Sequence, residues 1–374
     1  MAGVYVHFPF CRSKCAYCDF ASYPGREALM APYCQRLLAE LAARRGALSG
    51  PVGSVYFGGG TPTALPADLL CDTVASALGR LELAANAEIT LEANPGTVDG
   101  DTLARLRGIG VNRLSLGLQS ADDALLARLG RIHRYADFRR AYEAARRAGF
   151  DNISVDLMFA LPGQSHGSLA ASLAEVIALG PEHISCYCLR VEPGTPFAQQ
   201  LAAGSLNLPG EDEAADMLAL VRRTLAGASY DPYEISNFCR PGRASRHNLT
   251  YWRGGEYLGV GCAAASFLAG ARTANTPDLA AYLAADDPTA SAERPEGREA
   301  MFEFVMLGMR LKSGLDMAEF SRRFGMTPRQ AYPEQIAQLT RAGLLAGDGV
   351  TCLKPTERGV ALNNQLLLPF LDYR

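Results

Sequence analysis

Three cysteines near the N-terminus are the residues whose type and spacing point most directly to chemistry. Cys11, Cys15 and Cys18 have the spacing C-x3-C-x2-C and directly follow an apolar segment. Three thiolates on one short loop can bind three irons of a [4Fe–4S] cluster and leave the fourth iron without a protein ligand. The alternatives are a zinc site and a disulfide framework. Zinc normally takes four ligands, however, and no second Cys pair or Cys/His pair lies at the usual distance. The spacing therefore predicts a [4Fe–4S] cluster with an exchangeable ligand on one iron.

Polar residues and glycines recur at the ends of short apolar segments further along the chain. Gly58, Gly59 and Gly60 end one such segment, and glycines let the backbone approach a ligand closely. Glu92 and Gln119 end two further apolar segments, and Asp156 lies inside a third. Arg131 follows the segment that Gln119 ends. An acid inside an apolar strand needs a partner, because burying an unpaired charge is unfavourable. Ordinary turns and rim ion pairs are the alternatives for the single positions. Together the residues predict a polar ring around one cavity.

The elements that must position these residues alternate between strand-like and helix-like patterns. Short segments rich in β-branched, aromatic or alternating residues are predicted strands, at 4–8, 54–57, 88–93, 113–118, 154–159 and 183–189. Between and after them lie helical patterns, at 28–45, 67–81, 100–107, 138–148, 168–179 and 211–225. Such alternation favours a parallel sheet. We therefore predict an α/β fold for residues 1–229, an incomplete (βα)6 barrel with its reactive groups at the carboxyl ends of the strands.

The alternation stops at about residue 230, and we expect three further parts. Residues 230–285 are rich in glycine and aromatic residues, which predicts a β-rich extension. Residues 286–297 are charged, contain two prolines and are predicted to be a linker. Residues 298–374 show three helical patterns and a hairpin, which predicts a C-terminal winged-helix-like module. The helix at 333–342 has no basic face, so we expect this module to contact the barrel or a partner protein rather than DNA.

The composition of the 374 residues limits the compartment and the partners. Their net charge of −3 shows no global footprint for nucleic acid or an anionic membrane. No apolar run approaches the ~20 residues that a membrane-spanning helix needs. The N-terminal residues lack the pattern of a signal peptide. We therefore expect a cytoplasmic protein with no integral membrane segment and no nucleic-acid partner.

The motifs resemble those of the oxygen-independent coproporphyrinogen III oxidase family, which belongs to the radical S-adenosylmethionine (SAM) proteins. The resemblance covers nearly the whole chain and includes YVHFPF at 5–10, GGTP at 59–62, EANP at 92–95, GLQS at 117–120 and DLMFALPG at 156–163. It implies that SAM binds the fourth iron of the cluster. It also implies which residues contact SAM, namely Tyr5, Tyr17, Gly59, Gly60, Thr61, Glu92, Gln119, Arg131 and Asp156.

Two departures from the oxidase pattern put its reaction in doubt. The oxidases continue the cysteine run as C-x3-C-x2-C-x-C, whereas Phe20 occupies the last of these positions here. The oxidases also carry an extension before their first strand, whereas the first predicted strand begins by Val4 here. We therefore expect no oxidative decarboxylation of coproporphyrinogen III, and whether the chain is an enzyme at all stays open.

A second motif, H-N-x-x-Y-W at 247–252, resembles the signature of the heme chaperones in this family. A neutral imidazole such as that of His247 is a common axial ligand of heme iron. Tyr251 and Trp252 could pack on a porphyrin face. The alternative is that Trp252 anchors the extension and that His247 forms only local hydrogen bonds.

Three functions are therefore compatible with the sequence. The favoured one is a cluster- and SAM-dependent chaperone that binds heme and transfers it to an acceptor protein. The second is an oxygen-independent coproporphyrinogen III oxidase, and the third is a radical SAM modifier of RNA or protein. The sequence does not identify the acceptor. It also leaves open whether membrane-bound acceptors are contacted, whether heme is held covalently, whether SAM is cleaved and whether the chain forms a homodimer.

Overall fold

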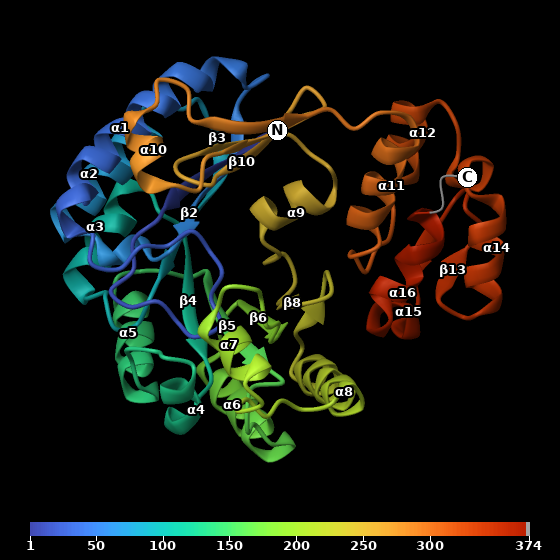
Figure 1. Cartoon of the computed structure of the whole chain (residues 1–374), viewed down its shortest axis with the longest axis horizontal. Helices are drawn as coiled ribbons and strands as arrows, with labels where there is room; N and C mark the ends of the chain where they lie inside the picture. The colour runs from blue at the N-terminus through green and yellow to red at the C-terminus, as the bar shows by residue number, and fades with distance from the viewer. Residues whose placement is uncertain (372–374) are drawn as a thin grey trace.

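Six parallel strands follow one another in the sheet in the order of the chain. The computed structural model describes residues 1–371. The six strands are β1 (Ala2–Phe8), β2 (Val52–Gly59), β3 (Leu83–Ala93), β4 (Arg113–Gln119), β5 (Ile153–Phe159) and β6 (His183–Cys188). Helices on the outer face connect them (Figure 1), namely α1 (Met30–Arg44), α2 (Ala67–Leu78), α3 (Gly100–Ile109), α4 (Asp123–Arg128), α5 (Tyr135–Arg147) and α6 (His166–Leu179). The predicted α/β partial barrel is confirmed.

The barrel does not close, because its first and last strands pair with later parts of the chain. After helices α7 (Pro196–Ala202) and α8 (Glu211–Gly227), strands β7 (Asp231–Pro232) and β8 (Asn237–Cys239) extend the sheet beyond β6. On the other side, β9 (Tyr257–Val260) pairs in parallel with β1. Strands β10 (Ala265–Leu268) and β11 (Ala271–Asn275) then continue antiparallel. The result is one sheet of twelve strands within residues 1–371.

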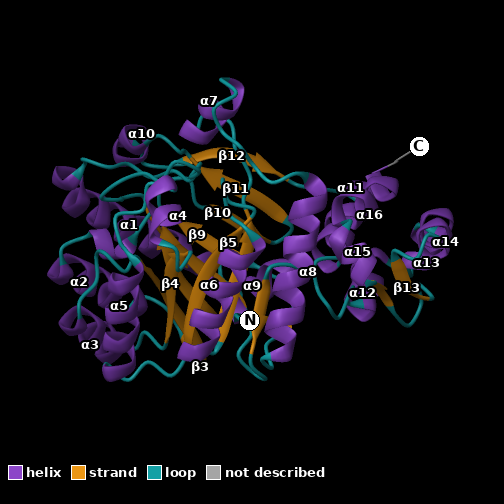
Figure 2. Cartoon of the chain, turned by 90° about the horizontal axis from the view of Figure 1, so that it is seen from below, coloured by secondary structure: helices purple, strands orange, loops and turns teal. Residues whose placement is uncertain are grey.

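Three elements of the predicted extension and linker differ from expectation. The H-N-x-x-Y-W motif forms a helix, α9 (Arg246–Trp252), because Ser245 caps its N-terminus by accepting a hydrogen bond from the Asn248 N–H at 3.3 Å. A second helix, α10 (Leu279–Ala284), precedes the predicted linker. Within that linker, β12 (Thr289–Glu293) pairs antiparallel with β11 at the edge of the sheet (Figure 2). Every residue of β12 is exposed, so it lacks the buried apolar alternation that identifies a strand in a sequence.

The C-terminal module lies to one side of the barrel (Figures 1 and 2) and has a hydrophobic core of its own. It contains the three expected helices and hairpin together with shorter helices; these elements are α11 (Gly297–Gly308), α12 (Met317–Phe324), α13 (Pro328–Ala331), α14 (Pro333–Arg341), β13 (Leu345–Gly347), β14 (Leu353–Pro355), α15 (Glu357–Ala361) and α16 (Asn363–Leu367). Ion pairs connect it to the rest of the chain. Arg310 contacts the buried Glu234 at 3.2 Å, and Glu303 of α11 contacts Arg272 of β11 at 2.7 Å. No helix within residues 1–371 is long and apolar enough to span a bilayer.

The inner face of the barrel is polar, whereas its outer face is apolar. Successive residues of a strand point to opposite faces. The outward residues of β1 and β4, such as Val4, Val6, Leu114 and Leu116, belong to the main hydrophobic core. The inward residues include Tyr56, Glu92, Arg113, Ser115, Asp156 and Ser185. Closed (βα)8 barrels usually fill their interior with branched aliphatic side chains. The polar interior therefore marks a binding cavity rather than a packed core.

Candidate functional site

The loop after β1 carries the three cysteines at the mouth of the barrel. Cys11, Cys15 and Cys18 are all free thiols and are partly exposed. The Cys11 sulfur lies 3.4 Å from the Thr61 hydroxyl, and an Arg131 Nη atom donates to the Cys15 sulfur at 3.7 Å. No three His, Cys, Asp or Glu side chains within residues 1–371 converge closely enough to hold a single metal ion. The loop therefore presents three separate thiols beside a cation.

The glycine turn after β2 is shaped by two close contacts. The Gly60 N–H donates to the Phe8 carbonyl at 2.8 Å, which fixes the turn against the end of β1. A Cβ atom at Gly60 would lie only 2.7 Å from the Phe10 carbonyl oxygen. Gly59 has φ +112°, and a Cβ atom there would lie 2.6 Å from the His7 ring. Side chains are therefore excluded from both positions, and the turn brings bare backbone to the cysteine loop.

Glu92 ends β3 and faces the glycine turn. Its carboxylate accepts hydrogen bonds from the Tyr56 hydroxyl at 2.7 Å and from the Gly59 N–H at 3.2 Å. Burial raises the pKa of Glu92 to about 7, because removal from water disfavours the charged form more than these hydrogen bonds favour it. Glu92 can therefore gain or lose a proton near neutral pH.

Gln119 and Asp156 lie on β4 and β5, the next two strands of the sheet after the β3 strand of Glu92. The Ser115 hydroxyl donates to Asp156 at 3.0 Å, and burial raises the pKa of Asp156. Gln119 has φ +71°, a left-handed conformation that is unfavourable for a residue other than glycine. Strained backbone of this kind persists where the surrounding structure imposes it, and it gathers at functional sites. An Arg131 Nη atom donates to the Gly117 carbonyl at 2.6 Å, which holds the arginine over the end of β4.

One cavity of about 370 Å³ brings these groups together. The predicted cluster and SAM residues that line it are Cys11, Cys15, Cys18, Tyr17, Gly59, Gly60, Thr61, Glu92, Gln119, Arg131 and Asp156. Tyr5 alone does not line it, and its hydroxyl lies 3.0 Å from a ring nitrogen of His7. The structure thus places all of the predicted cluster and SAM residues except Tyr5 around a single space, in agreement with the polar ring expected from the sequence.

Sequence reasoning missed several polar groups on the cavity floor. These are Arg113, Ser115, Ser154, Ser185, Tyr187 and Asn248. Arg113 is 2% exposed, and no ion pair within residues 1–371 involves it. The serines and Arg113 alternate with apolar residues along β4, β5 and β6. That alternation was the available signal, because in a barrel the polar residues of an alternating strand can face inward as well as outward.

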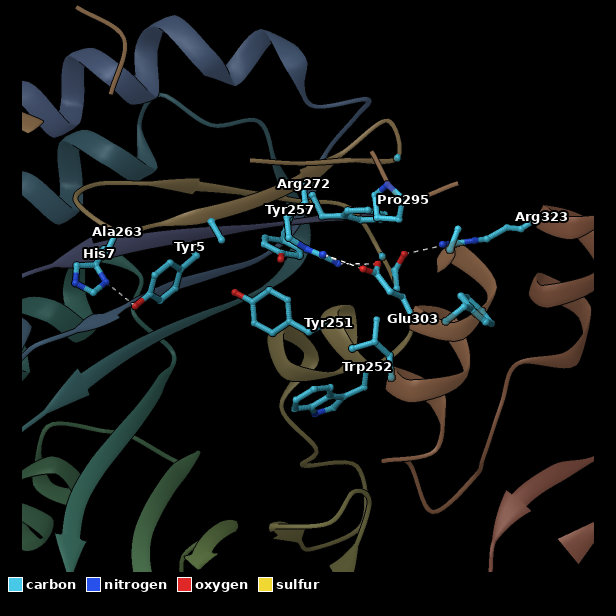
Figure 3. A pocket seen from close by; sticks show the side chains of 18 of the residues that line it. Tyr5, His7, Tyr251, Trp252, Tyr257, Ala263, Arg272, Pro295, Glu303 and Arg323 are labelled. Carbon is cyan, nitrogen blue, oxygen red and sulfur yellow. Dashed lines mark hydrogen bonds and ion pairs between the residues drawn. The ribbon is translucent and has the colours of Figure 1, made fainter. Parts of the chain in front are cut away.

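A second cavity of about 740 Å³ lies between the sheet extension and the C-terminal module (Figure 3). Its walls are largely apolar and aromatic, and Tyr251 and Trp252 of α9 line it. Phe304 of α11 lines it from the module. Phe20, Gly59 and Glu92 line both cavities. The two spaces are therefore neighbours with a common wall.

His247 lies apart from both cavities. Its side chain is 1% exposed, and both ring nitrogens are in hydrogen bonds, one with the Ser54 hydroxyl at 2.9 Å and one with the Tyr251 hydroxyl at 2.8 Å. Burial, together with the positive charge of Arg113, lowers the pKa of His247 to about 3. This geometry disagrees with His247 as an axial heme ligand. It favours the alternative of local hydrogen bonding, in which the imidazole positions Tyr251 one helical turn away.

The fold and the three-cysteine cavity together define a radical SAM protein. The profile of the Radical SAM superfamily matches residues 5–176, and that of the HemN C-terminal domain matches residues 296–362. Coproporphyrinogen III oxidase (HemN) from Escherichia coli superposes with a TM-score of 0.86 at 23% identity, covering 100% of this chain and 90% of that one.

Two curated relatives share about the whole length of the chain. "Heme chaperone HemW" from Lactococcus lactis is 35% identical over 371 residues, covering 99% of this chain and 97% of the relative. "Heme chaperone HemW" from Escherichia coli K12 is 35% identical over 381 residues, covering 99% and 98%. The chain belongs to the HemW family of radical SAM proteins.

Proposed function

We propose that Cys11, Cys15 and Cys18 hold a [4Fe–4S] cluster and that the 370 Å³ cavity binds SAM. The support is the donor set, which consists of three free thiols with no fourth cysteine in register. The cluster would supply an iron that SAM can bind with its amino and carboxylate groups. Arg131 contacts Cys15 and places a positive charge beside the ligand loop. Tyr17, Gln119 and Asp156 would position the adenosine, and the turn at 59–61 the methionyl group.

We further propose that the protein is a heme chaperone that binds heme and surrenders it to an acceptor protein. The observation that carries this proposal is the second cavity, to which the H-N-x-x-Y-W motif contributes Tyr251 and Trp252. Its volume of about 740 Å³ falls within the usual range of roughly 300–1,000 Å³ for ligand sites. Its aromatic walls suit the apolar faces of a porphyrin. The family membership supports the same assignment.

Phe20 distinguishes this proposal from the oxidase alternative. The oxidase pattern has a cysteine at this position, whereas here a phenylalanine with 63% exposure lines both cavities. An apolar side chain at the common wall cannot supply a thiol to a reaction, but it can contact a porphyrin. We place this activity in the cytoplasm, where reducing conditions keep cysteine thiols free.

The test is a pair of assays on protein that has been reconstituted anaerobically with iron and sulfide. Heme is titrated into the protein and followed by its visible spectrum, and apomyoglobin is then added as a probe acceptor. We expect heme to bind with one site per chain and to pass to the probe. In parallel, coproporphyrinogen III is incubated with SAM and a reductant. Formation of protoporphyrinogen IX there, or failure to bind heme, would contradict the proposal.

A further inference from the structure

A phenol and a guanidinium lie side by side on one wall of the second cavity. Phe267 of β10 is directly opposite Tyr257 of β9 and directly opposite Arg272 of β11. Residues paired in this way project from the same face of a sheet. All three line the cavity, and Tyr257 and Arg272 are adjacent in Figure 3. The strand register therefore aims an oxygen ligand and a cation into the same space.

Most other groups that could bind iron in this cavity already have partners. The two ring nitrogens of His7 lie 3.0 Å from the Tyr5 hydroxyl and 3.0 Å from the Ala21 carbonyl. The contact with His7 also engages the Tyr5 hydroxyl. The Tyr251 hydroxyl is bonded to His247. No cysteine from the described residues lines this cavity. The imidazole and these two phenols are thus held by the protein itself.

The two acids of the cavity are occupied as well. Glu92 accepts hydrogen bonds from Tyr56 and Gly59. Glu303 receives both Nη groups of Arg272, at 2.9 Å and 2.7 Å. Arg272 also contacts Glu293 at 2.6 Å, so it is fixed from both sides. Tyr257 is the remaining oxygen ligand. Its hydroxyl interacts with the fixed cation Arg272, which can also pair with a phenolate, and Glu303 is the nearby acid.

Charges around Tyr257 act in opposite directions on its ionisation. Burial raises the pKa of Tyr257, and the carboxylate of Glu303 adds to this. Arg272 lowers the pKa, both by its charge and by hydrogen bonding. Tyr251 packs edge-on against the ring at 4.5 Å between centroids. Arg272 and Glu303 are the charged groups that act on the Tyr257 hydroxyl. A phenolate formed here would be paired with Arg272.

We propose that Tyr257 is the axial ligand of ferric heme in this cavity and that Arg272 positions and stabilises its phenolate. This inference rests on the proposed function. In the binding step the phenol releases its proton to solvent, and the phenolate oxygen donates an electron pair to ferric iron. No electron is transferred. Tyrosinate is an established protein ligand of ferric heme iron. The H-N-x-x-Y-W motif then shapes the pocket, with His247 holding Tyr251, and does not supply the ligand.

The first experiment compares Tyr257→Phe and His247→Ala with the wild type in titrations with ferric heme. We expect the wild type to show a phenolate-to-iron charge-transfer band. Tyr257→Phe should lose this band and bind heme more weakly by roughly tenfold or more. His247→Ala should keep the band. A wild-type spectrum in Tyr257→Phe would overturn the inference but not the proposed function. Failure of the wild type to bind heme would overturn both.

The second experiment separates the charge of Arg272 from its structural role. Arg272→Gln and Glu303→Gln break the same ion pair, so a purely structural effect would be alike in the two variants. The charge effect has opposite signs. Arg272→Gln should move the appearance of the charge-transfer band to higher pH, because the phenolate loses its cation. Glu303→Gln should move it to lower pH, because an opposing acid is removed. Shifts in the same direction would remove Arg272 from the proposal.

Discussion

Replacement of Glu92 by Gln should make the stability of the chain less sensitive to pH. A pKa difference of one unit corresponds to about 1.4 kcal/mol. In the unfolded chain this carboxyl ionises near its ordinary pKa of 4.5, whereas in the folded chain its pKa is about 7. Between these values the folded state binds more protons, so stability falls as the pH rises. The penalty should reach about 3 kcal/mol above pH 7.

Glutamine removes this penalty but also removes an acceptor. Its amide can still accept from Tyr56 through one oxygen, whereas the hydrogen bond from the Gly59 N–H is lost, which costs about 1 kcal/mol at every pH. Glu92→Gln should therefore be no more stable than the wild type near pH 5. Near pH 8 it should be more stable by about 2 kcal/mol.

The assay is urea denaturation of ligand-free protein, followed by circular dichroism at several values between about pH 5 and pH 8. Glu299→Gln, on the exposed face of α11, makes the same chemical change away from the cavity and should follow the wild-type curve. Parallel curves for Glu92→Gln and the wild type would refute the reasoning, because they would show that Glu92 ionises at the same pH in both states. We also expect Glu92→Gln to bind SAM more weakly, because a substitution that stabilises a functional site often impairs its function.

Three further changes test other parts of the molecule. Cys15→Ala should abolish the visible absorbance of a reconstituted cluster, and a full complement of iron in that variant would contradict the ligand assignment. Asp156→Ala should weaken SAM binding in equilibrium dialysis while iron content stays constant; unchanged affinity would remove Asp156 from the site. Glu40→Ala should lower the free energy of unfolding by about 3 kcal/mol, because the buried carboxylate accepts from the Tyr282 hydroxyl at 2.6 Å and the Gly261 N–H at 2.9 Å. A loss below about 1 kcal/mol would contradict this account.

The barrel and the first cavity were predictable because their signals are local in the sequence. Strand–helix alternation favours a parallel sheet, and in such a sheet the carboxyl ends of the strands meet at one edge. Glu92, Gln119 and Asp156 could therefore be placed around one space without coordinates. Asn248 could not, because it reaches the cavity from α9 rather than from a barrel strand.

The second cavity was not predictable, because it is built from parts that are distant in the sequence. Its walls come from β9–β11 on one side and from α11 and α12 on the other. Tyr257 begins the short strand Y-L-G-V, and nothing in that run distinguishes a ligand from an edge residue. Only the pairing of β9 with β10 and of β10 with β11 aligns it with Arg272. The position of His247 was equally hidden, since a seven-residue helix can turn its histidine inward or outward.

The common wall of the two cavities connects the loop of the proposed cluster with the second cavity. Phe20 lies two residues beyond Cys18, so one short loop contributes both a thiol to the first cavity and an aromatic side chain to the second. Metal binding fixes the conformation of the loop that supplies its ligands. The proposed cluster would therefore also fix the position of Phe20 in the wall of the second cavity. We expect binding of the proposed cluster to affect the second cavity as well as the first.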